Sequence, residues 1–315
     1  MRTTAAKALR LVIVMLLLTM LSFGAQSLLP GDPAELIAAT TDTAKIEEVR
    51  ADLELDRPLP VRYVKWLGDF VTGDLGDYYR NKGGTPSESV KEALPNSLLL
   101  MLYTQLVALA LAIPLGVLTA YRANGIFDKT TNIAAFLALS IPGFVLAYLL
   151  KKYLALDNRW LPDSGWVPIS EDFGEHVRHA VLPVLALSLS QVAVYFRLLR
   201  SDMIATLQED FITMAKAKGL RPGRVLFRHA LRPSSLTLLT VAGLNVGTLI
   251  SSAVLVERIF RVPGMGFLLV EGVLSREYPA TQSFIAIVGL LFVLINYGVD
   301  FLYSVIDPRI RHRHG

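Results

Sequence analysis

Residues 201–234 hold a cluster of basic side chains in a long polar break between two apolar segments. The cluster consists of Lys216, Lys218, Arg221, Arg224, Arg228 and Arg232. Cations spaced in this way could contact lipid phosphates, read a nucleic acid or dock onto another protein. Because the flanking apolar segments are suited to a membrane, nucleic acid is the weakest of these interpretations.

Apolar residues accompany the charges in the same segment. They are Phe211, Met214, Ala215, Leu220, Val225, Leu226 and Leu231. Contact with lipid accounts for part of the charge of any cytoplasmic loop, but it does not account for these apolar side chains. Their pattern suits a knob that sits in a groove of a partner protein.

Other groups that could do chemistry are few. The chain has no cysteine, which excludes disulfides, thiolate metal sites and cysteine nucleophiles. It also has no Gly-x-x-x-x-Gly-Lys-Ser/Thr phosphate loop, so a partner must handle any ATP. His176 and His179 could share a helix face and ligate a metal. Without nearby cysteines or paired carboxylates, we favour an interfacial polar face and expect no metal site.

Polar residues inside apolar runs could line a transport path. Asp300 is the only acid well inside a predicted span, and we favour pairing with a basic neighbour over a proton relay. Gln105, Asn245 and Asn296 are candidates for the path, although hydrogen bonds between helices explain them equally well. An ion-coupled secondary transporter would be expected to carry more intramembrane charge.

The elements that must position these residues are membrane helices. With 315 residues, of which 53% are hydrophobic, the chain is too apolar for a soluble domain, and we predict an all-α polytopic membrane protein. The apolar runs predict six transmembrane helices, at residues 9–29, 97–121, 131–150, 180–199, 236–256 and 283–306. Pro142-Gly143 predicts a kink in the third helix, and the spacing of Gly243 and Gly247 predicts close approach of another helix.

Charge sets the expected orientation. The basic segment 201–234 favours the cytoplasm, and four crossings place it on the side of the N-terminus. We therefore expect a multi-pass protein of the cytoplasmic membrane with both termini inside, and an uncleaved first span rather than a signal peptide. Three parts follow: tail and first span (1–29), an external insertion (30–96) with helical stretches at 42–55 and 61–70, and the core (97–315).

The basic segment itself predicts a helix-turn-helix. Residues 202–218 and 221–231 are expected to be helical. Gly219 suits the helix stop between them because it accepts a positive φ, and Pro222 suits the first turn of the second helix.

At this turn the sequence resembles the permease subunits of bacterial ABC importers. Their cytoplasmic signature runs Glu-Ala-Ala, three residues, then Gly. Aligned on Gly219, its first three positions are Thr213, Met214 and Ala215, so Ala215 and Gly219 match while Thr213 replaces the acid. This departure is similar to the dipeptide and oligopeptide branch, where the stretch commonly reads like Ala215-Lys-Ala-Lys-Gly219-Leu220 and Arg228-His229-Ala230-Leu231-Arg232.

Further motifs extend the resemblance over nearly the whole chain. In order they are Leu55-Asp56-Arg57-Pro58-Leu59-Pro60, Gly73-Asp74-Leu75-Gly76, Ser140-Ile141-Pro142, Val256-Glu257, Pro263-Gly264-Met265-Gly266, Tyr278-Pro279 and Asp307-Pro308-Arg309. The large insertion is similar to that of the first of the two permeases in such systems.

The resemblance implies a transport subunit that is not an enzyme. It implies ATP and Mg bound by two ATPase subunits or a fused one, a second homologous permease, an extracytoplasmic solute-binding protein, and lipid, but no nucleic acid. The residues implied in coupling to the ATPase are Thr213, Met214, Ala215, Lys218, Gly219, Leu220, Arg224, Leu226 and Arg228.

Alternatives remain for the function. Relatives of this branch carry dipeptides, longer peptides, nickel or other small solutes, and no residue here discriminates among them. Two interpretations come from other classes of protein. One is a secondary transporter, and the other is a membrane-anchored scaffold whose external insertion is the working part.

Overall fold

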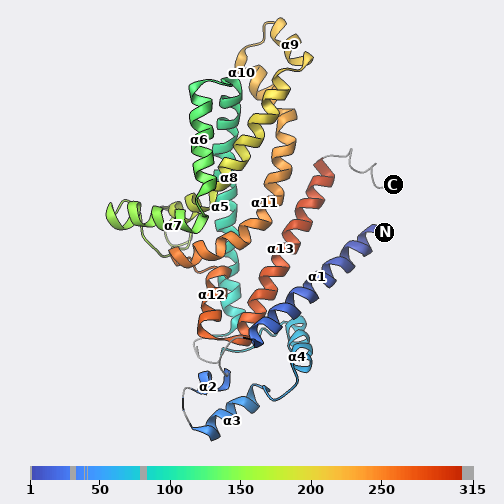
Figure 1. The fold of residues 1–315 in the computed structure, drawn as a ribbon, viewed down its shortest axis with the longest axis vertical. Coiled ribbons are helices and arrows are strands. Elements are labelled where there is room, and N and C mark those ends of the chain that lie inside the picture. The colour runs from blue at the N-terminus through green and yellow to red at the C-terminus, as the bar shows by residue number, and fades with distance from the viewer. Residues whose placement is uncertain (1, 29–32, 39, 41, 79–83, 307–315) are drawn as a thin grey trace. The chain divides into compact units, whose positions relative to one another are not determined.

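The computed structural model describes residues 2–28, 33–38, 40, 42–78 and 84–306, and every regular element in this part is helical. In order the elements are α1 (Arg2–Ser27), α2 (Pro33–Ala38), α3 (Thr43–Asp52), α4 (Leu59–Thr72), α5 (Pro86–Tyr121), α6 (Ile126–Ser140), α7 (Gly143–Leu150), the π-helical η1 (Lys151–Asp157), α8 (Phe173–Leu207), α9 (Asp210–Ala217), α10 (Pro222–Arg224), the π-helical η2 (Val225–Ala230), α11 (Leu231–Phe260), α12 (Met265–Ser275) and α13 (Tyr278–Ile306). Figure 1 labels the α-helices.

Long apolar helices confirm the membrane class. Five are long and apolar enough to cross a bilayer: Leu9–Ser27, Pro86–Tyr121, Phe173–Leu207, Pro222–Phe260 and Tyr278–Val299. The pair formed by α6 and α7 with η1 raises the total to six if it counts as one span. The described residues therefore contain five or six candidate spans, against the six predicted.

The predicted kink in the third span is a sharp break. The axes before and after Ile141 and Pro142 differ by 102°. Ile141 has extended backbone (φ −95°, ψ 121°), as expected for a residue that precedes proline, and Pro142 is also outside the helical region (φ −55°, ψ 137°). Two successive non-helical residues reorient the chain more than a lost hydrogen bond alone would.

The chain forms two compact units. One unit comprises residues 97–262 and 295–315. Its core lies around α8, which packs on α6, α7 and α11. Tyr195, Phe196 and Leu199 of α8 are fully buried against small residues of α5 such as Ala108 and Ala112.

The glycines of α11 fit tightly against the second half of α13. A Cβ atom at Gly243 would lie 2.5 Å from Cγ1 of Val299, and one at Gly247 would lie 2.6 Å from Nδ2 of Asn296. The predicted close helix approach at this spacing is confirmed.

The other unit comprises residues 1–96 and 263–294. Within this unit, Gln282 of α13 forms hydrogen bonds to α1. Its Oε1 accepts from Ser22 Oγ and Gln26 Nε2, both at 3.0 Å, and its Nε2 donates to the Thr19 carbonyl at 2.9 Å. A small core of Val90, Ala93, Met265, Ala280 and Phe284 connects the beginnings of α5, α12 and α13.

Candidate functional sites

The predicted helix-turn-helix is a short elbow at one end of the helices α8 and α11, which we define as residues 208–231 (Figure 1). The chain leaves α8 at Gln208, turns through the extended Glu209 (φ −71°, ψ 149°), and forms α9. After a turn at Gly219, it begins α10 at Pro222.

The turn of the elbow has the hydrogen bonds of a Schellman motif. The Leu220 amide donates to the Ala215 carbonyl at 3.3 Å, and the Gly219 amide donates to the Lys216 carbonyl at 3.0 Å. Gly219 has φ +73°, in the left-handed region that favours glycine. The predictions of a helix stop at Gly219 and of Pro222 in the next first turn are confirmed.

Both predicted helices of this segment had the wrong boundaries. The helix predicted at 202–218 is broken at Gln208 and Glu209, so its first part belongs to α8. The helix predicted at 221–231 does not end, but runs through η2 into α11 as one helix, Pro222–Phe260. Pro233 does not end this helix, because a membrane helix tolerates proline where neighbouring groups satisfy the freed carbonyl. The next residue, Ser234, is buried in the core and so keeps this part of the helix in place.

Burial divides the apolar residues of the elbow into two groups. Ile212, Ala215, Val225, Leu226 and Ala230 are buried in the core around α8. The exposed group comprises Phe211, Met214 and Phe227. The sequence interpretation missed Phe227, which is 55% exposed, because it follows the buried Leu226 and only the helix phase separates the two.

The residues implied in coupling divide in the same way. Ala215 and Leu226 are buried, and Leu220 is half-buried beside them. The exposed members are Thr213, Met214, Lys218, Gly219, Arg224 and Arg228. The elbow thus exposes cations and apolar side chains together, while its buried residues pack in the core around α8.

Two polar contacts join the helices that flank the elbow to each other and to α6. Ser234 Oγ of α11 donates to Thr206 Oγ1 of α8 at 2.8 Å, with Ser234 buried. Arg200 of α8 binds Asp128 in the first turn of α6 through Nε and Nη2, at 2.5 and 2.6 Å. The sequence interpretation missed Asp128, which lies between the spans predicted at 97–121 and 131–150.

Two of the three candidate path residues meet on α8. Gln105 of α5 accepts from the Tyr195 hydroxyl and donates to the Ala242 carbonyl, both at 3.2 Å. Asn245 of α11 donates to Gln191 Oε1 at 3.1 Å, one turn of α8 from Tyr195. Asn296 lies against Gly247. These contacts join helices, and whether the same residues line a path stays a prediction.

The histidines have structural partners. His176 is fully buried, its Nδ1 lies 2.6 Å from the Val167 carbonyl, and its Nε2 lies 3.1 Å from the Tyr103 hydroxyl. A carbonyl only accepts, so Nδ1 donates to Val167, and the other ring nitrogen lies within hydrogen-bond distance of Tyr103. His179 Nδ1 lies 2.8 Å from the Glu175 carbonyl. Among the residues that the structure describes, no group of three His, Cys, Asp or Glu residues could hold a metal.

The pairing of Asp300 with a basic neighbour stays a prediction. The side chain of Asp300 and residues 307–315 lie outside the described residues.

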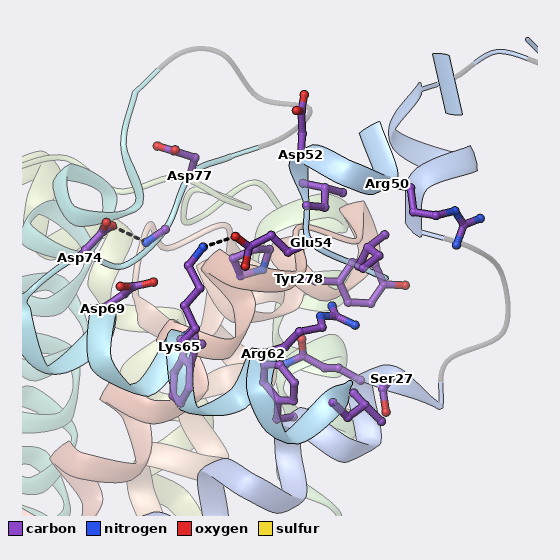
Figure 2. Close-up of a pocket in the computed structure, with 18 residues that line it drawn as sticks. Ser27, Arg50, Asp52, Glu54, Arg62, Lys65, Asp69, Asp74, Asp77 and Tyr278 are labelled. Carbon is purple, nitrogen blue, oxygen red and sulfur yellow. Dashed lines mark hydrogen bonds and ion pairs between the residues drawn. The ribbon is translucent and has the colours of Figure 1, made fainter. Parts of the chain in front are cut away.

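A charged cleft of about 500 Å³ lies in the unit that contains α1 (Figure 2). Aspartates 69, 74 and 77 lie toward one end in this view, and Arg62 and Tyr278 lie toward the other. Between them Lys65 Nζ donates to Glu54 Oε1 at 2.6 Å, and this hydrogen bond holds the pKa of the Glu54 carboxyl below its usual range. The cleft gives the 42–78 region a water-facing charged surface.

The sequence of the chain matches known transport proteins. Residues 112–312 match the family described as binding-protein-dependent transport system inner membrane component, and residues 1–85 match the N-terminal membrane component of such systems. The oligopeptide transport system permease protein AppB of Bacillus subtilis (strain 168) is 36% identical over 302 residues, which cover 95% of this chain and 96% of that protein.

Two further relatives have similar coverage. The probable peptide ABC transporter permease protein y4tP of Sinorhizobium fredii (strain NBRC 101917 / NGR234) is 36% identical over 287 residues, 90% of this chain and 91% of its own. A putative peptide permease protein of Brucella suis biovar 1 (strain 1330) is 35% identical over 305 residues, 95% of each chain.

Proposed function

The chain belongs to the family of inner-membrane components of binding-protein-dependent transport systems, and on that premise we propose that it forms half of the path of an ATP-driven peptide importer. Members of this family are multi-pass permeases rather than enzymes, and they work with a binding protein and an ATPase. Peptide is the proposed substrate because three relatives that match over nine tenths of the chain or more are named for peptide or oligopeptide transport.

The elbow is the proposed contact with the ATPase. The observation that carries this proposal is its division into a buried base and an exposed tip. Ile212 and Val225 anchor it in the core around α8, while Met214 and Phe227 expose apolar surface. Arg224 and Arg228 add exposed positive charge nearby. An apolar contact surrounded by charges is the usual composition of a specific protein interface.

The remaining assignments follow from this one. The elbow faces the cytoplasm, where ATP is, so both termini are cytoplasmic and residues 30–96 lie outside. A second homologous permease completes the path, two ATPase subunits or a fused one bind ATP and Mg, and this chain needs no cofactor of its own. Thr213, Lys218, Gly219 and the other residues named above for coupling are proposed to contact the ATPase or shape the surface that does.

Site-directed cross-linking of the assembled importer tests the elbow contact. Because the chain has no cysteine, Met214→Cys or Phe227→Cys introduces a single reactive thiol. Either should form a cross-link to an ATPase subunit. Leu239→Cys, an exposed position in the α11 span, is the matched control and should form none. If neither elbow position forms a cross-link to an ATPase subunit, the proposed contact is wrong.

Uptake into sealed vesicles tests the function as a whole. Vesicles that contain the complete importer, its binding protein and internal ATP should accumulate short peptides. Accumulation that persists without ATP and collapses with the proton gradient would instead indicate a secondary transporter.

A further inference from the structure

Helix α4 has three distinct faces. Tyr63, Trp66 and Phe70 form an aromatic face, and Arg62, Lys65 and Asp69 form a charged face. Val61, Val64 and Val71 form a third face, which we call the valine stripe. At 100° per residue these valines fall within roughly a quarter of the helix circumference. Val64 is 66% exposed and Val71 is 77% exposed, whereas Trp66 on the aromatic face is buried.

The aromatic face packs on α1, which is a candidate membrane span. Phe23 of α1 meets Tyr63 edge to face, with ring centroids 5.7 Å apart, and its ring centroid is 6.3 Å from that of Trp66. Trp66 is buried, and its Nε1 donates to Ser283 Oγ of α13 at 3.2 Å. Contacts to two candidate spans hold α4 firmly in its unit.

The Tyr63 side chain reaches deep alongside α1. Its hydroxyl lies 2.9 Å from Thr19 Oγ1 and donates to the Leu16 carbonyl at 3.3 Å. The span runs from Leu9 to Ser27, so Leu16 lies about 16 Å along the axis from its end at a rise of about 1.5 Å per residue. The hydrocarbon core of a bilayer is about 30 Å thick. Leu16 therefore lies near the middle of the core, and α4 lies beside the half of the span that ends at Ser27.

Apolar side chains of α1 that lie close in sequence to its contacts with α4 are exposed as well. Leu17, Met20 and Leu21 of α1 are all exposed, as expected for side chains that face lipid. The charged face of α4, by contrast, lines the cleft in Figure 2, where Arg62, Lys65 and Asp69 are among the lining residues. One helix thus has a charged face toward the cleft and a separate apolar face with no cover among the described residues.

We propose that α4 lies against the lipid beside the half of α1 that ends at Ser27, and that its valine stripe contacts lipid acyl chains. A helix with one charged face and a large apolar face is stable at a boundary between lipid and water, because each face meets the medium that suits it. The lipid contact would fix the floor of the cleft at the membrane surface. The inference concerns how the region between α1 and α5 is attached and does not depend on the transported solute.

Nitroxide labels test the inference in the full chain. A single cysteine is placed at Val64, at Val71 or, as the matched control on the charged face, at Asp69, and the labelled protein is reconstituted in phospholipid nanodiscs. Oxygen concentrates in lipid, whereas a nickel chelate stays in water. We expect the ratio of oxygen to nickel accessibility to be several-fold higher at positions 64 and 71 than at 69.

Two results would overturn the proposal. High nickel accessibility at Val64 and Val71, equal to that at Asp69, would place the stripe in water. Low accessibility to both reagents at the two valines would mean that protein covers the stripe, either a second copy of this chain or another subunit. All three positions are exposed, so the labels do not disturb the core. Peptide uptake by the assembled importer, measured separately, distinguishes failure here from failure of the proposed function.

Discussion

Asp128 and Arg200 face each other through two parallel hydrogen bonds that join the start of α6 to α8. The Asp128 side chain is only 4% exposed, and it also accepts from the Asn124 amide and Asn132 Nδ2, both at 2.8 Å. The geometry is the bidentate arrangement that arginine forms with a carboxylate. Both bonds hold the beginning of α6 against the helix that leads into the elbow.

Removing one member of this pair should destabilise the protein. Asp128→Ala leaves the guanidinium of Arg200 without its partner, at a cost of about 1–3 kcal/mol. The cost stays below that of a fully buried pair because the Arg200 side chain is 22% exposed. Thermal unfolding in detergent should show a lowered midpoint. Arg200→Lys keeps the charge but loses the planar fork, so its loss should be smaller, and the exposed Glu171→Gln should change nothing.

A bulky residue at Gly219 should uncouple transport. The left-handed backbone there disfavours a β-branched side chain by about 1–2 kcal/mol, so Gly219→Val should distort the turn while the spans still insert. Uptake in vesicles should fall strongly at unchanged membrane abundance. Gly219→Asn is the matched control, because asparagine adopts this conformation more readily. Normal uptake by the valine variant would count against a role of the turn in coupling.

The contact between Gly243 and Val299 predicts opposite effects for two alanine substitutions. Gly243→Ala puts a methyl group 2.5 Å from a stiff valine side chain, and the overpacking should cost about 1–3 kcal/mol. Gly298→Ala has open space within 4 Å and gains helix propensity, so it should be neutral or stabilising by up to about 1 kcal/mol. Equal unfolding midpoints for the two variants would show that α11 and α13 pack differently.

The Glu54–Lys65 pair predicts a pH dependence of stability. Lys65 lowers the pKa of the Glu54 carboxyl, so the pair stabilises the fold above the ordinary value of 4.5 and the contribution is lost as pH falls through the lowered pKa. Glu54→Gln should lower the unfolding midpoint at neutral pH and merge with the wild type in strong acid. Lys65→Met should behave alike. A constant difference at all pH values would contradict this origin.

Local sequence signals predicted the elements with dedicated residues. Gly219, Pro222 and Pro142 each mark a position where the backbone has restricted choices, and each is a turn or a break in the structure. Long apolar runs predicted helices of membrane length, because the length and composition of such a run are enough to indicate a membrane span.

Tertiary contacts decided the features that the sequence interpretation missed. Gln208 and Glu209 are good helix formers, yet the helix breaks there because Ile212 and Ala215 must reach the core. Asp128 and Arg200 are far apart in the sequence, and only helix packing brings them together. The exposure of Phe227 likewise depends on how its helix is rotated about its axis, and no nearby residue in the sequence determines that rotation.

The helix that begins at Pro222 has a consequence for how force crosses the membrane. It continues without a break to Phe260, a length of nearly 60 Å at about 1.5 Å per residue. The π-helical η2 and Pro233 make its backbone hydrogen bonds irregular near the elbow, and helices bend at such places. A displacement at Pro222 nevertheless reaches Phe260 through one continuous helix, with no loop in between.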